Sequence, residues 1–435
     1  MFFEKIQNVD LGKVAIVADG KTFTFGDILN IAKQRAIFFE GKRDAFLLCH
    51  PSELENLLNF FAIMAAGAKG IFGGKNLSEE QKNNFSVIHN CTIVDFTPNE
   101  EKPITVLHKP SQSEYFLGVL SSGSTGQSKL IWKDYQSWFT AFPHQSDIFG
   151  ITKQDSVFVL DALAYSANLN TVLHTLWQGA TVVLGKLTEA SNWSNLFNQQ
   201  GVTSAFLVPS HIRLLVNDAS FLTLGLKSLV SAGEKLDSKL AQIVLNNFPD
   251  ILLTEYYGAA ELGHVSYAQN QDIVEHPTTV GKAFPGVEIE IKEEKIFVES
   301  PYISPEYRNI RTVFDFGFLD SDGRLCVFGR QGRMFNRRGL NIFAEEIENA
   351  ALQHPFVKEA VLISNTHKLH ILELIVVVKQ EISKSELQDF LLKKITKDKL
   401  PNKISFSLSI PRNEAGKVDF RVMAKKPVDE ENLVR

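Results

Sequence analysis

The 435-residue chain has only three cysteines and no long uninterrupted apolar run. Cys49, Cys91 and Cys326 lie far apart, and they form neither a Cys-x-x-Cys pair nor a disulfide framework. A membrane-spanning helix needs about 18 or more consecutive apolar residues, and no stretch of the sequence approaches that length. The sequence therefore predicts a protein of a reducing compartment without a membrane span.

Excess positive charge and a secretory leader are also missing. Lys and Arg number 45 against 50 Asp and Glu, for a formal net charge of −5. This balance gives no bulk attraction to nucleic acid or to an anionic membrane. Residues 1–5 lack the cationic segment and apolar run that open a signal peptide. We expect a cytoplasmic protein with no nucleic-acid partner.

Short apolar runs alternate with helix-like segments over most of the first 260 residues. Hydrophobic residues make up 44% of the chain, which is ample for sizeable cores. The alternation is typical of α/β layering with buried parallel strands. Helices are expected at residues 52–66 and 170–178. The expected strands are residues 14–17, 45–49, 86–88, 116–120, 156–160, 181–184, 205–209, 229–234 and 251–254.

The pattern changes after about residue 275 to shorter alternating segments that favour antiparallel strands, at 287–291 and 295–298. Residues 329–333, Gly-Arg-Gln-Gly-Arg, form a short charged connector with two glycines, which predicts a hinge. The remaining hundred or so residues indicate a small α+β domain. Its expected elements are helices at 344–353 and from Ser383, and strands at 359–363, 370–378 and 404–410.

The most informative segment is residues 121–129, Ser-Ser-Gly-Ser-Thr-Gly-Gln-Ser-Lys, which follows an apolar strand. Glycines let several backbone N–H groups point at one anion, hydroxyls add donors, and Lys129 adds positive charge. A Walker loop would need glycine immediately before the lysine, where Ser128 stands. The segment predicts a phosphate-binding loop of another kind.

Four further segments follow this loop in a recognisable order. They are residues 256–261 (Tyr-Tyr-Gly-Ala-Ala-Glu), 315–317 (Asp-Phe-Gly), the region from 329 to 348, and 411–417 (Pro-Arg-Asn-Glu-Ala-Gly-Lys). Together with the loop they resemble the motifs of the adenylate-forming (AMP-binding) superfamily. That superfamily includes acyl-CoA synthetases, aryl-acid ligases and peptide-synthetase adenylation domains.

The resemblance implies an α/β fold with two domains. An N-terminal AMP-binding domain, residues 1–329, would hold layered, mostly parallel sheets and a β-rich subdomain, and residues 330–435 would form a small mobile α+β lid. The implied reaction joins a small-molecule carboxylic acid to ATP with Mg²⁺, which gives an acyl-adenylate and pyrophosphate. A pantetheine thiol, of CoA or of an acyl carrier protein, would then accept the acyl group.

Two residues carry the implied chemistry. Bringing a carboxylate against the α-phosphate of ATP sets two anions together, so the site needs concentrated positive charge. By resemblance, Lys417 bridges these two groups during the first half-reaction. Glu261 resembles the family's magnesium ligand, since Mg²⁺ on phosphate oxygens stabilises the charge that develops on pyrophosphate.

The other nucleotide-binding residues are assigned by their motifs. Tyr257 and Gly258 would form one wall of the adenine slot, by ring stacking and close backbone approach, and Gly233 with Glu234 the other. Asp315 resembles the ribose-binding aspartate, with Arg330 as a ribose or phosphate partner. The loop residues and one neighbour of Glu261 complete the set: Ser121, Ser122, Gly123, Ser124, Thr125, Gly126, Lys129 and Ala260.

The acid pocket is expected between the phosphate loop and Glu261. Ser166 stands where amino-acid-activating relatives carry an aspartate for the α-ammonium group, and a buried ammonium without a counter-charge is costly. A plain acyl or aryl acid is therefore favoured. Gly339 resembles the glycine beside which the pantetheine arm runs. The remaining candidates for the pocket are Tyr165, Asn168, Val208, Ser231, Ala232, Ala259 and Gly263.

The chain also departs from the family pattern. Gly332 stands at the usual hinge aspartate or lysine, Phe314 replaces a small residue before Asp315, and Asn336 replaces a frequent lysine. Two alternatives stay open. One is a stand-alone enzyme that adenylates an amino or β-amino acid for a carrier protein, and the other is a nucleotide-binding pseudoenzyme.

Overall fold

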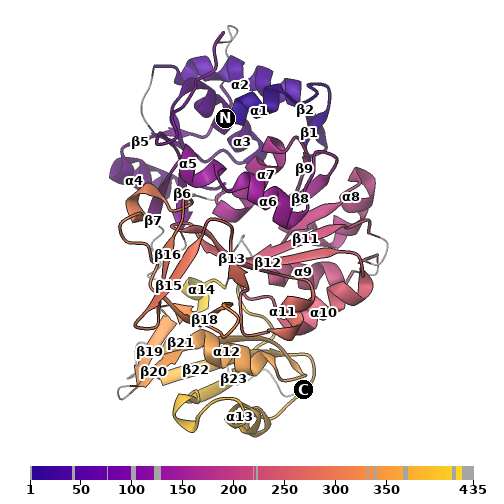
Figure 1. Cartoon of the computed structure of the whole chain (residues 1–435), viewed down its shortest axis with the longest axis vertical. Helices are drawn as coiled ribbons and strands as arrows, with labels where there is room; N and C mark the ends of the chain where they lie inside the picture. Colours follow the sequence, from indigo (N-terminus) through magenta and orange to yellow (C-terminus); the bar gives the residue numbers. More distant parts are fainter. Residues whose placement is uncertain are drawn as a thin grey trace.

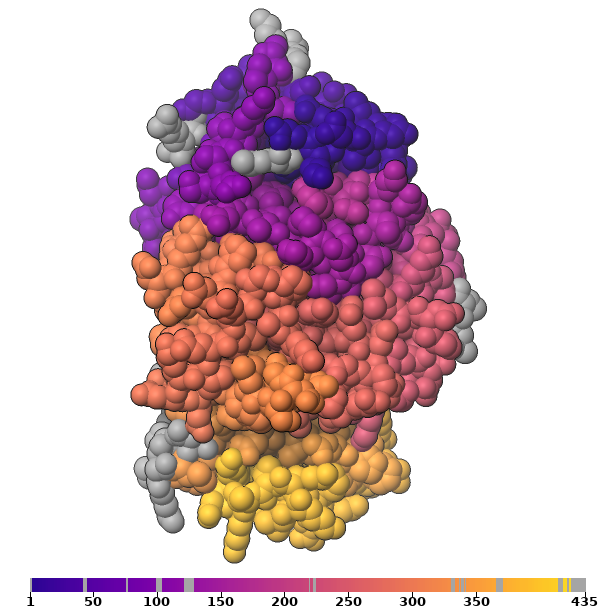
Figure 2. All heavy atoms as spheres, viewed as in Figure 1, coloured from indigo at the N-terminus to yellow at the C-terminus, as the bar shows by residue number. Residues whose placement is uncertain are grey.

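The computed structural model has a large body formed by the N-terminal and central parts of the chain, with the C-terminal strands and helices beneath it (Figure 1). The space-filling view shows the C-terminal part as the lower end of the molecule (Figure 2). The residues that the structure describes are 2–41, 45–75, 77–98, 104–121, 129–218, 220–221, 224–330, 333–337, 340–365, 371–413 and 418–423.

The largest sheet of the described residues has nine strands, in the order β14-β13-β12-β11-β10-β8-β9-β1-β2. Neighbours from β12 to β1 run parallel, whereas β13, β14 and β2 add antiparallel strands at the two edges. The strands are β1 (Val14–Ala18), β2 (Lys21–Thr24), β8 (Ser156–Leu160), β9 (Thr181–Gly185), β10 (Ser204–Phe206), β11 (Ser228–Ala232), β12 (Leu252–Ala259), β13 (Gly263–Gln269) and β14 (Lys282–Ala283).

A second sheet of five described strands has the order β5-β3-β4-β6-β7 and is parallel except for the last pair. Its strands are β3 (Ala45–Leu48), β4 (Lys69–Phe72), β5 (Cys91–Val94), β6 (Tyr115–Ser121) and β7 (Lys129–Asp134). One large hydrophobic core joins this sheet to one face of the nine-stranded sheet. Both sheets confirm the predicted α/β class with mostly parallel strands.

Helices cover the two sheets. One of them, α3, is buried on nearly every side and begins at Ser52, whose side chain accepts a hydrogen bond from the Glu55 N–H and caps the helix. The helices of the large body are α1 (Phe2–Gln7), α2 (Phe25–Phe39), α3 (Glu53–Ala66), α4 (Glu79–His89), α5 (Tyr135–Phe139), α6 (Phe142–Phe149), α7 (Ser166–Trp177), α8 (Trp193–Gln200), α9 (Pro209–Val216), α10 (Ser238–Asn247) and α11 (Gln271–Glu275).

The strand expected at residues 86–88 is wrong. These residues belong to α4, where Val87 is 82% and Ile88 73% exposed. The Ser78 cap and its reciprocal bond with Gln81 start the helix, and this local capping outweighs the β-propensity of the two apolar residues. The strand that follows is β5, which begins at Cys91.

The expected change of texture after residue 275 is confirmed by an antiparallel sheet, β15-β16-β17-β18. The following part of the chain has hydrophobic clusters of its own, drawn from residues 335–423. Its elements are listed together with those of the antiparallel sheet: β15 (Glu288–Lys292), β16 (Lys295–Glu299), β17 (Asp315–Leu319), β18 (Leu325–Arg330), β19 (Met334–Arg337), β20 (Leu340–Phe343), α12 (Ala344–Leu352), β21 (Val357–Asn365), β22 (Ile371–Val378), α13 (Lys384–Leu392), β23 (Lys403–Phe406) and α14 (Phe420–Met423).

The connector predicted as a hinge is anchored on its C-terminal side by Arg333. The Arg333 guanidinium donates to Glu345 at 3.1 Å and to both oxygens of Glu348 at 2.5 and 3.1 Å, and it lies 4.8 Å from the ring centroid of Phe420. Arg333 therefore belongs to the C-terminal packing unit. None of the helices in the described segments has the length and apolar character needed to cross a membrane.

Candidate active site

Most predicted nucleotide and acid residues meet at one edge of the nine-stranded sheet. Tyr165 follows β8, Val208 follows β10, Gly233 follows β11, and Ala259 ends β12. These four strands are parallel, so their carboxyl ends lie at the same edge. Ligands of open α/β sheets bind at that edge. The fold therefore brings together segments that are up to a hundred residues apart in sequence.

The predicted phosphate loop connects the two strands of a hairpin. Ser121 at the end of β6 pairs with Lys129 at the start of β7, which closes the neck of the loop. The Lys129 side chain is exposed. Ser122, Gly123, Ser124, Thr125 and Gly126 lie outside the described residues, so their contacts with phosphate stay a prediction.

The predicted adenine and ribose residues form one cluster. The Tyr257 hydroxyl donates a 2.5 Å hydrogen bond to Oδ2 of Asp315. Asp315 is buried, with only 1% of its surface exposed. Asp315 begins β17 and pairs in register with Arg330 at the end of β18. The backbone thus places both predicted ribose residues next to the tyrosine of the adenine wall.

Gly258 is the position in this cluster where only glycine fits. A Cβ atom there would lie 2.4 Å from the carbonyl oxygen of Gly263 on the paired strand β13. The register of β12 and β13 shifts between Tyr257 and Gly258, so the strand bends at this point. The close approach of the two strands therefore excludes any side chain at position 258.

Phe314, which replaces a small residue of the family motif before Asp315, has an unusual backbone conformation. Phe314 has φ of +61°, a left-handed conformation in which glycine is favoured and a bulky side chain is strained. Its N–H donates to the Thr312 Oγ1 at 2.9 Å, and Thr312 in turn donates to the Ile296 carbonyl at 2.7 Å. These two bonds hold the turn that directs Asp315 inward while the Phe314 ring stays 44% exposed.

Glu261 lies in the turn between β12 and β13, half-buried, with its backbone carbonyl accepting a 2.8 Å bond from the Ser304 N–H. The described residues contain no group of three or more His, Cys, Asp or Glu side chains suited to hold a metal. Mg²⁺ is commonly held by one or two carboxylates together with phosphate oxygens. A single carboxylate such as that of Glu261 therefore fits this ion, which would supply positive charge to the phosphates of ATP.

Ser166, at the start of α7, supplies no carboxylate for a substrate ammonium group. Ser166 is the first residue of α7, with Tyr165 as its N-terminal cap. The nearest acidic residue in the chain, Asp161, is bound to Lys75 at 2.9 Å. A neutral or hydroxyl-lined surface at this position suits an acid without an α-ammonium group.

One predicted pocket residue, Asn168, has its side chain bonded elsewhere, and another, Ser231, lies on the opposite face of its strand from Ala232. The Asn168 side chain donates to the Leu160 and Ala162 carbonyls at 3.1 and 3.3 Å, so it closes the β8–α7 connection. Ser231 pairs in register with Glu255, on the face of β11 opposite Ala232. Their roles as lining residues stay predictions, and the geometry favours Ala232 over Ser231.

Aromatic residues that the sequence analysis did not select lie on the Ala232 face of the sheet. Tyr256 pairs with Ala232 in register, and the His264 ring lies 4.7 Å from the Tyr256 ring and 4.9 Å from that of Phe284. Burial lowers the pKa of His264 to about 3, so its imidazole is neutral. Tyr256 reaches this face through its in-register pairing with Ala232 of the neighbouring strand, a long-range feature that no local pattern signals.

Lys133 is a second residue that the sequence analysis missed. It lies in β7, is 1% exposed, and its ammonium lies 5.8 Å from the Trp138 ring centroid. Burial lowers the pKa of Lys133 to about 8, and the charges of Glu261 and Asp134 oppose that shift. A lysine inside an apolar strand carries no sequence signal of its own, so only the fold reveals its proximity to Glu261.

The C-terminal part of the predicted site is described only at its base. Lys417 and Gly339 lie outside the described residues, as does Gly332 of the hinge. Arg412 and Val418 form an antiparallel bridge, so the segment that contains Lys417 begins and ends at adjacent backbone positions. Its position over the acid and ATP therefore stays a prediction.

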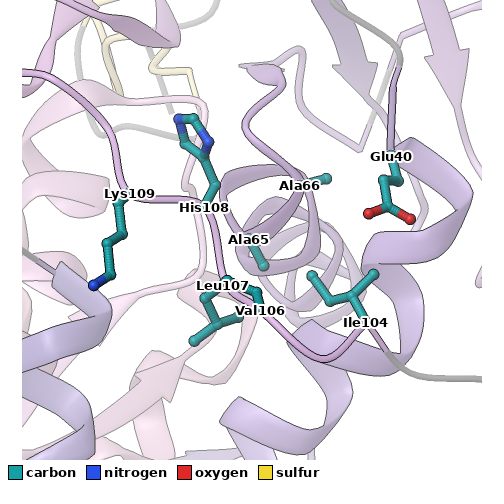
Figure 3. A pocket seen from close by; sticks show the side chains of 8 residues that line it. All are labelled: Glu40, Ala65, Ala66, Ile104, Val106, Leu107, His108 and Lys109. Atoms are coloured by element: carbon teal, nitrogen blue, oxygen red, sulfur yellow. The ribbon is translucent and has the colours of Figure 1, made fainter.

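A surface depression of about 380 Å³ lies apart from these residues (Figure 3). It is formed by the ends of α2 and α3 and by the segment 104–109, with Glu40 at one end and Lys109 at the other. None of the predicted site residues lines it. The lining residues are Glu40, Ala65, Ala66, Ile104, Val106, Leu107, His108 and Lys109.

Comparisons with known proteins agree with this geometry. Residues 75–301 match the model of the AMP-binding enzyme family, and residues 346–417 match that of the AMP-binding enzyme C-terminal domain. The uncharacterized acyl-CoA ligase YhfT of Bacillus subtilis is 26% identical over 96% of both chains.

Solved structures show the same fold. ATP-bound MatB from Rhodopseudomonas palustris has a TM-score of 0.85 at 17% identity over 97% of both chains. The o-succinylbenzoate CoA synthetase MenE of Bacillus subtilis, in complex with ATP and magnesium, has a TM-score of 0.80 at 20% identity, covering 96% of this chain and 97% of that one. The chain belongs to the AMP-binding enzyme family and is an ATP-dependent acid–thiol ligase that works through an acyl-adenylate.

Proposed function

We propose that this chain activates a plain acyl or aryl carboxylic acid, rather than an α-amino acid, and transfers it to CoA. The observation that carries the proposal is the hydrogen bond between Tyr257 and Asp315, because it joins two side chains that the motifs assign to ATP binding. The choice of acid is supported by Ser166, which carries no carboxylate, and by Asp161, whose carboxylate is bound to Lys75.

The residues would share the work of the first half-reaction. A carboxylate oxygen of the acid attacks the α-phosphorus of ATP, and the bond to the bridging oxygen breaks to release pyrophosphate. Lys417 would offset the repulsion between the two anions, and Lys129 with the loop residues would hold the leaving phosphates. Glu261 would hold Mg²⁺, and Asp315 would accept from the ribose hydroxyls.

The second half-reaction needs a different arrangement of the chain. We propose that residues 1–329 and 330–435 are the two domains and that the smaller one rotates about residues 329–333. The CoA thiolate then attacks the acyl carbonyl carbon, the bond to phosphate breaks, and AMP leaves. Gly339 would lie beside the pantetheine arm. The separate hydrophobic clusters of residues 335–423 support a unit that can move as a body.

An acyl carrier protein is the other acceptor compatible with pantetheine chemistry, and the cytoplasm is the proposed location. The buried, unpaired state of Cys49, Cys91 and Cys326 supports a reducing compartment. No nucleic-acid partner is proposed, since the formal net charge is −5.

The test is acid-dependent ATP–pyrophosphate exchange with a panel of aromatic, fatty and amino acids. We expect exchange with a plain acid, followed by CoA thioester formation, and slower acylation of a holo-carrier protein. Lys417→Ala should abolish exchange, whereas Lys384→Ala, an exposed lysine at the start of α13, should not change it.

Other outcomes separate the alternatives. Exchange with amino acids only would replace the plain-acid proposal with carrier-protein loading of an amino acid. Tight ATP binding without exchange for any acid would indicate a nucleotide-binding pseudoenzyme. Unchanged exchange in Lys417→Ala would remove the role given to that lysine.

A further inference from the structure

Arg412 lies between two carboxylates from different parts of the chain. Its Nη1 donates to Glu234 Oε1 at 2.8 Å, and its Nη2 and Nε donate to Glu359 Oε2 at 2.8 and 3.2 Å. Glu359 lies in β21 of the C-terminal unit, whereas Glu234 follows β11 of the nine-stranded sheet. All three side chains are 18 to 27% exposed, so the two ion pairs are partly shielded from water.

Glu234 and Arg412 each lie next to a segment that the motifs assign to the active site. Glu234 follows Gly233, which has φ of +90° and belongs to the predicted adenine wall. Arg412 pairs with Val418, and the Asp419 N–H donates to the Pro411 carbonyl at 2.8 Å, so the base of the Lys417 segment is closed. The guanidinium therefore ties the base of the Lys417 segment to the adenine wall.

A domain rotation would affect the bonds of Arg412 to Glu359 and to Glu234 differently. Glu359 would move with Arg412, so that ion pair survives rotation about residues 329–333. Glu234 would stay behind, so that ion pair exists only when the C-terminal unit has its present position. The bonds to Glu359 would therefore keep the Arg412 guanidinium in its orientation while its bond to Glu234 breaks and forms.

We propose that the Arg412–Glu234 ion pair is a latch that stabilises the arrangement used for adenylation and opens before thiol attack. This inference rests on the proposed two-step function. It differs from the general domain rotation in naming the pair that biases its equilibrium.

The first test measures the two half-reactions separately, with an acid found in the exchange screen. Arg412→Met and Glu234→Gln should each slow exchange about tenfold, the effect of losing one charge-assisted hydrogen bond. Thioester formation from supplied acyl-adenylate and CoA should be unchanged or faster in Arg412→Met. Glu234 belongs to the predicted adenine wall, so Glu234→Gln is compared with the parent in exchange only. The double variant should lose no more exchange than Arg412→Met, because the bond removed by Glu234→Gln is already lost in that variant.

The matched control is Arg337→Met. The Arg337 guanidinium donates to the Asp398 and Leu400 carbonyls and to Asn402, all within the C-terminal unit. We expect no difference between the half-reactions in this variant. Equal losses in both half-reactions for Arg412→Met, or additive losses in the double variant, would overturn the latch.

A second test needs no acid and therefore stands apart from the substrate question. Spin labels on Asn247→Cys of α10 and Lys393→Cys after α13 lie on exposed positions of the two units, and the native cysteines are buried. Pulsed electron–electron distance measurements with ATP should give one main distance in the parent and a second population in Arg412→Met and Glu234→Gln. An unchanged distance distribution in both variants would overturn the latch even if exchange with every acid failed.

Discussion

The hydroxyl of Tyr257 and the carboxylate of Asp315 form a 2.5 Å hydrogen bond across 58 residues of sequence. The bond joins the end of β12 in the nine-stranded sheet to the first residue of β17 in the antiparallel sheet. It thereby fixes the relative position of two motifs that the sequence places far apart. Both side chains belong to the predicted nucleotide site, so the free enzyme already holds part of that site in place.

Tyr257→Phe tests the value of this bond. Loss of the hydroxyl leaves a buried carboxylate with one donor fewer, so the free energy of unfolding should fall by roughly 1.5 to 3 kcal/mol. The KM for ATP should rise because Asp315 is less well oriented, and kcat should change less. Urea unfolding and exchange kinetics measure the two effects. Tyr267→Phe in the adjacent strand β13 is the control, and an equal loss of stability there would remove the special role of the bond.

Acid sensitivity should come in part from His264. Burial, with a smaller contribution from the charge of Lys133, lowers the pKa of His264 to about 3. The unfolded chain binds a proton near pH 6.5 and the folded chain does not, so stability present above pH 6.5 is lost as the pH falls toward 3. The slope is about 1.4 kcal/mol per pH unit for one histidine.

His264→Phe keeps an aromatic ring between Tyr256 and Phe284 and removes the titrating nitrogen. Its unfolding free energy between pH 6.5 and 4 should fall less steeply than that of the parent, as urea titrations at several pH values would measure. His144→Phe, at a half-buried position, is the control. Parallel curves for the parent and His264→Phe would contradict the assignment.

Arg333 should be a large contributor to the stability of the C-terminal unit. It donates to Glu345 and Glu348, and Glu348 is only 9% exposed, so Arg333→Met would leave a buried carboxylate without its main partner. Removing one member of a buried ion pair costs about 3 to 5 kcal/mol. Limited proteolysis should cut this unit faster in the variant. Arg311→Met removes an exposed pair with Glu299 and should cost at most about 1 kcal/mol.

Local patterns predicted much of the fold. Ser52 capped the helix expected after it, and the apolar runs at 156–160 and 181–184 became β8 and β9. Residues 86–88 failed because a short segment with two apolar residues, Val87 and Ile88, does not distinguish a strand from the exposed end of a capped helix. The order of the elements and the periodicity of the strands therefore predicted the architecture. Residues 86–88 are helical because of the Ser78 cap, which the sequence analysis did not consider.

The site was less accessible from the sequence than the fold. Motifs identified Tyr257 and Asp315, but their contact depends on how two sheets pack. Ser231 was selected with its neighbour Ala232, although adjacent residues of a strand point to opposite faces. Arg412 belongs to a motif, yet its partner Glu234 lies 178 residues earlier, and no local pattern pairs them. Contacts between side chains that lie far apart in the sequence are therefore the part of the site that a single sequence does not reveal.

Lys133 gives an alkaline counterpart to the histidine prediction. Burial lowers its pKa to about 8, against roughly 10.4 in an unfolded chain. Below pH 8 both states bind the proton and the folded state bears the cost of a buried charge. Between pH 8 and about 10.4 the unfolded state binds more protons, so the stability contributed at this site rises by up to about 3 kcal/mol.

Lys133→Met should therefore be more stable than the parent at pH 7, and the difference should shrink as the pH approaches 10. Urea unfolding of both proteins from pH 7 to 10 measures it, with Lys129→Met, at an exposed position of the same strand, as the control. A stability difference that does not vary with pH would show that the ammonium of Lys133 is not the group that bears the cost of burial.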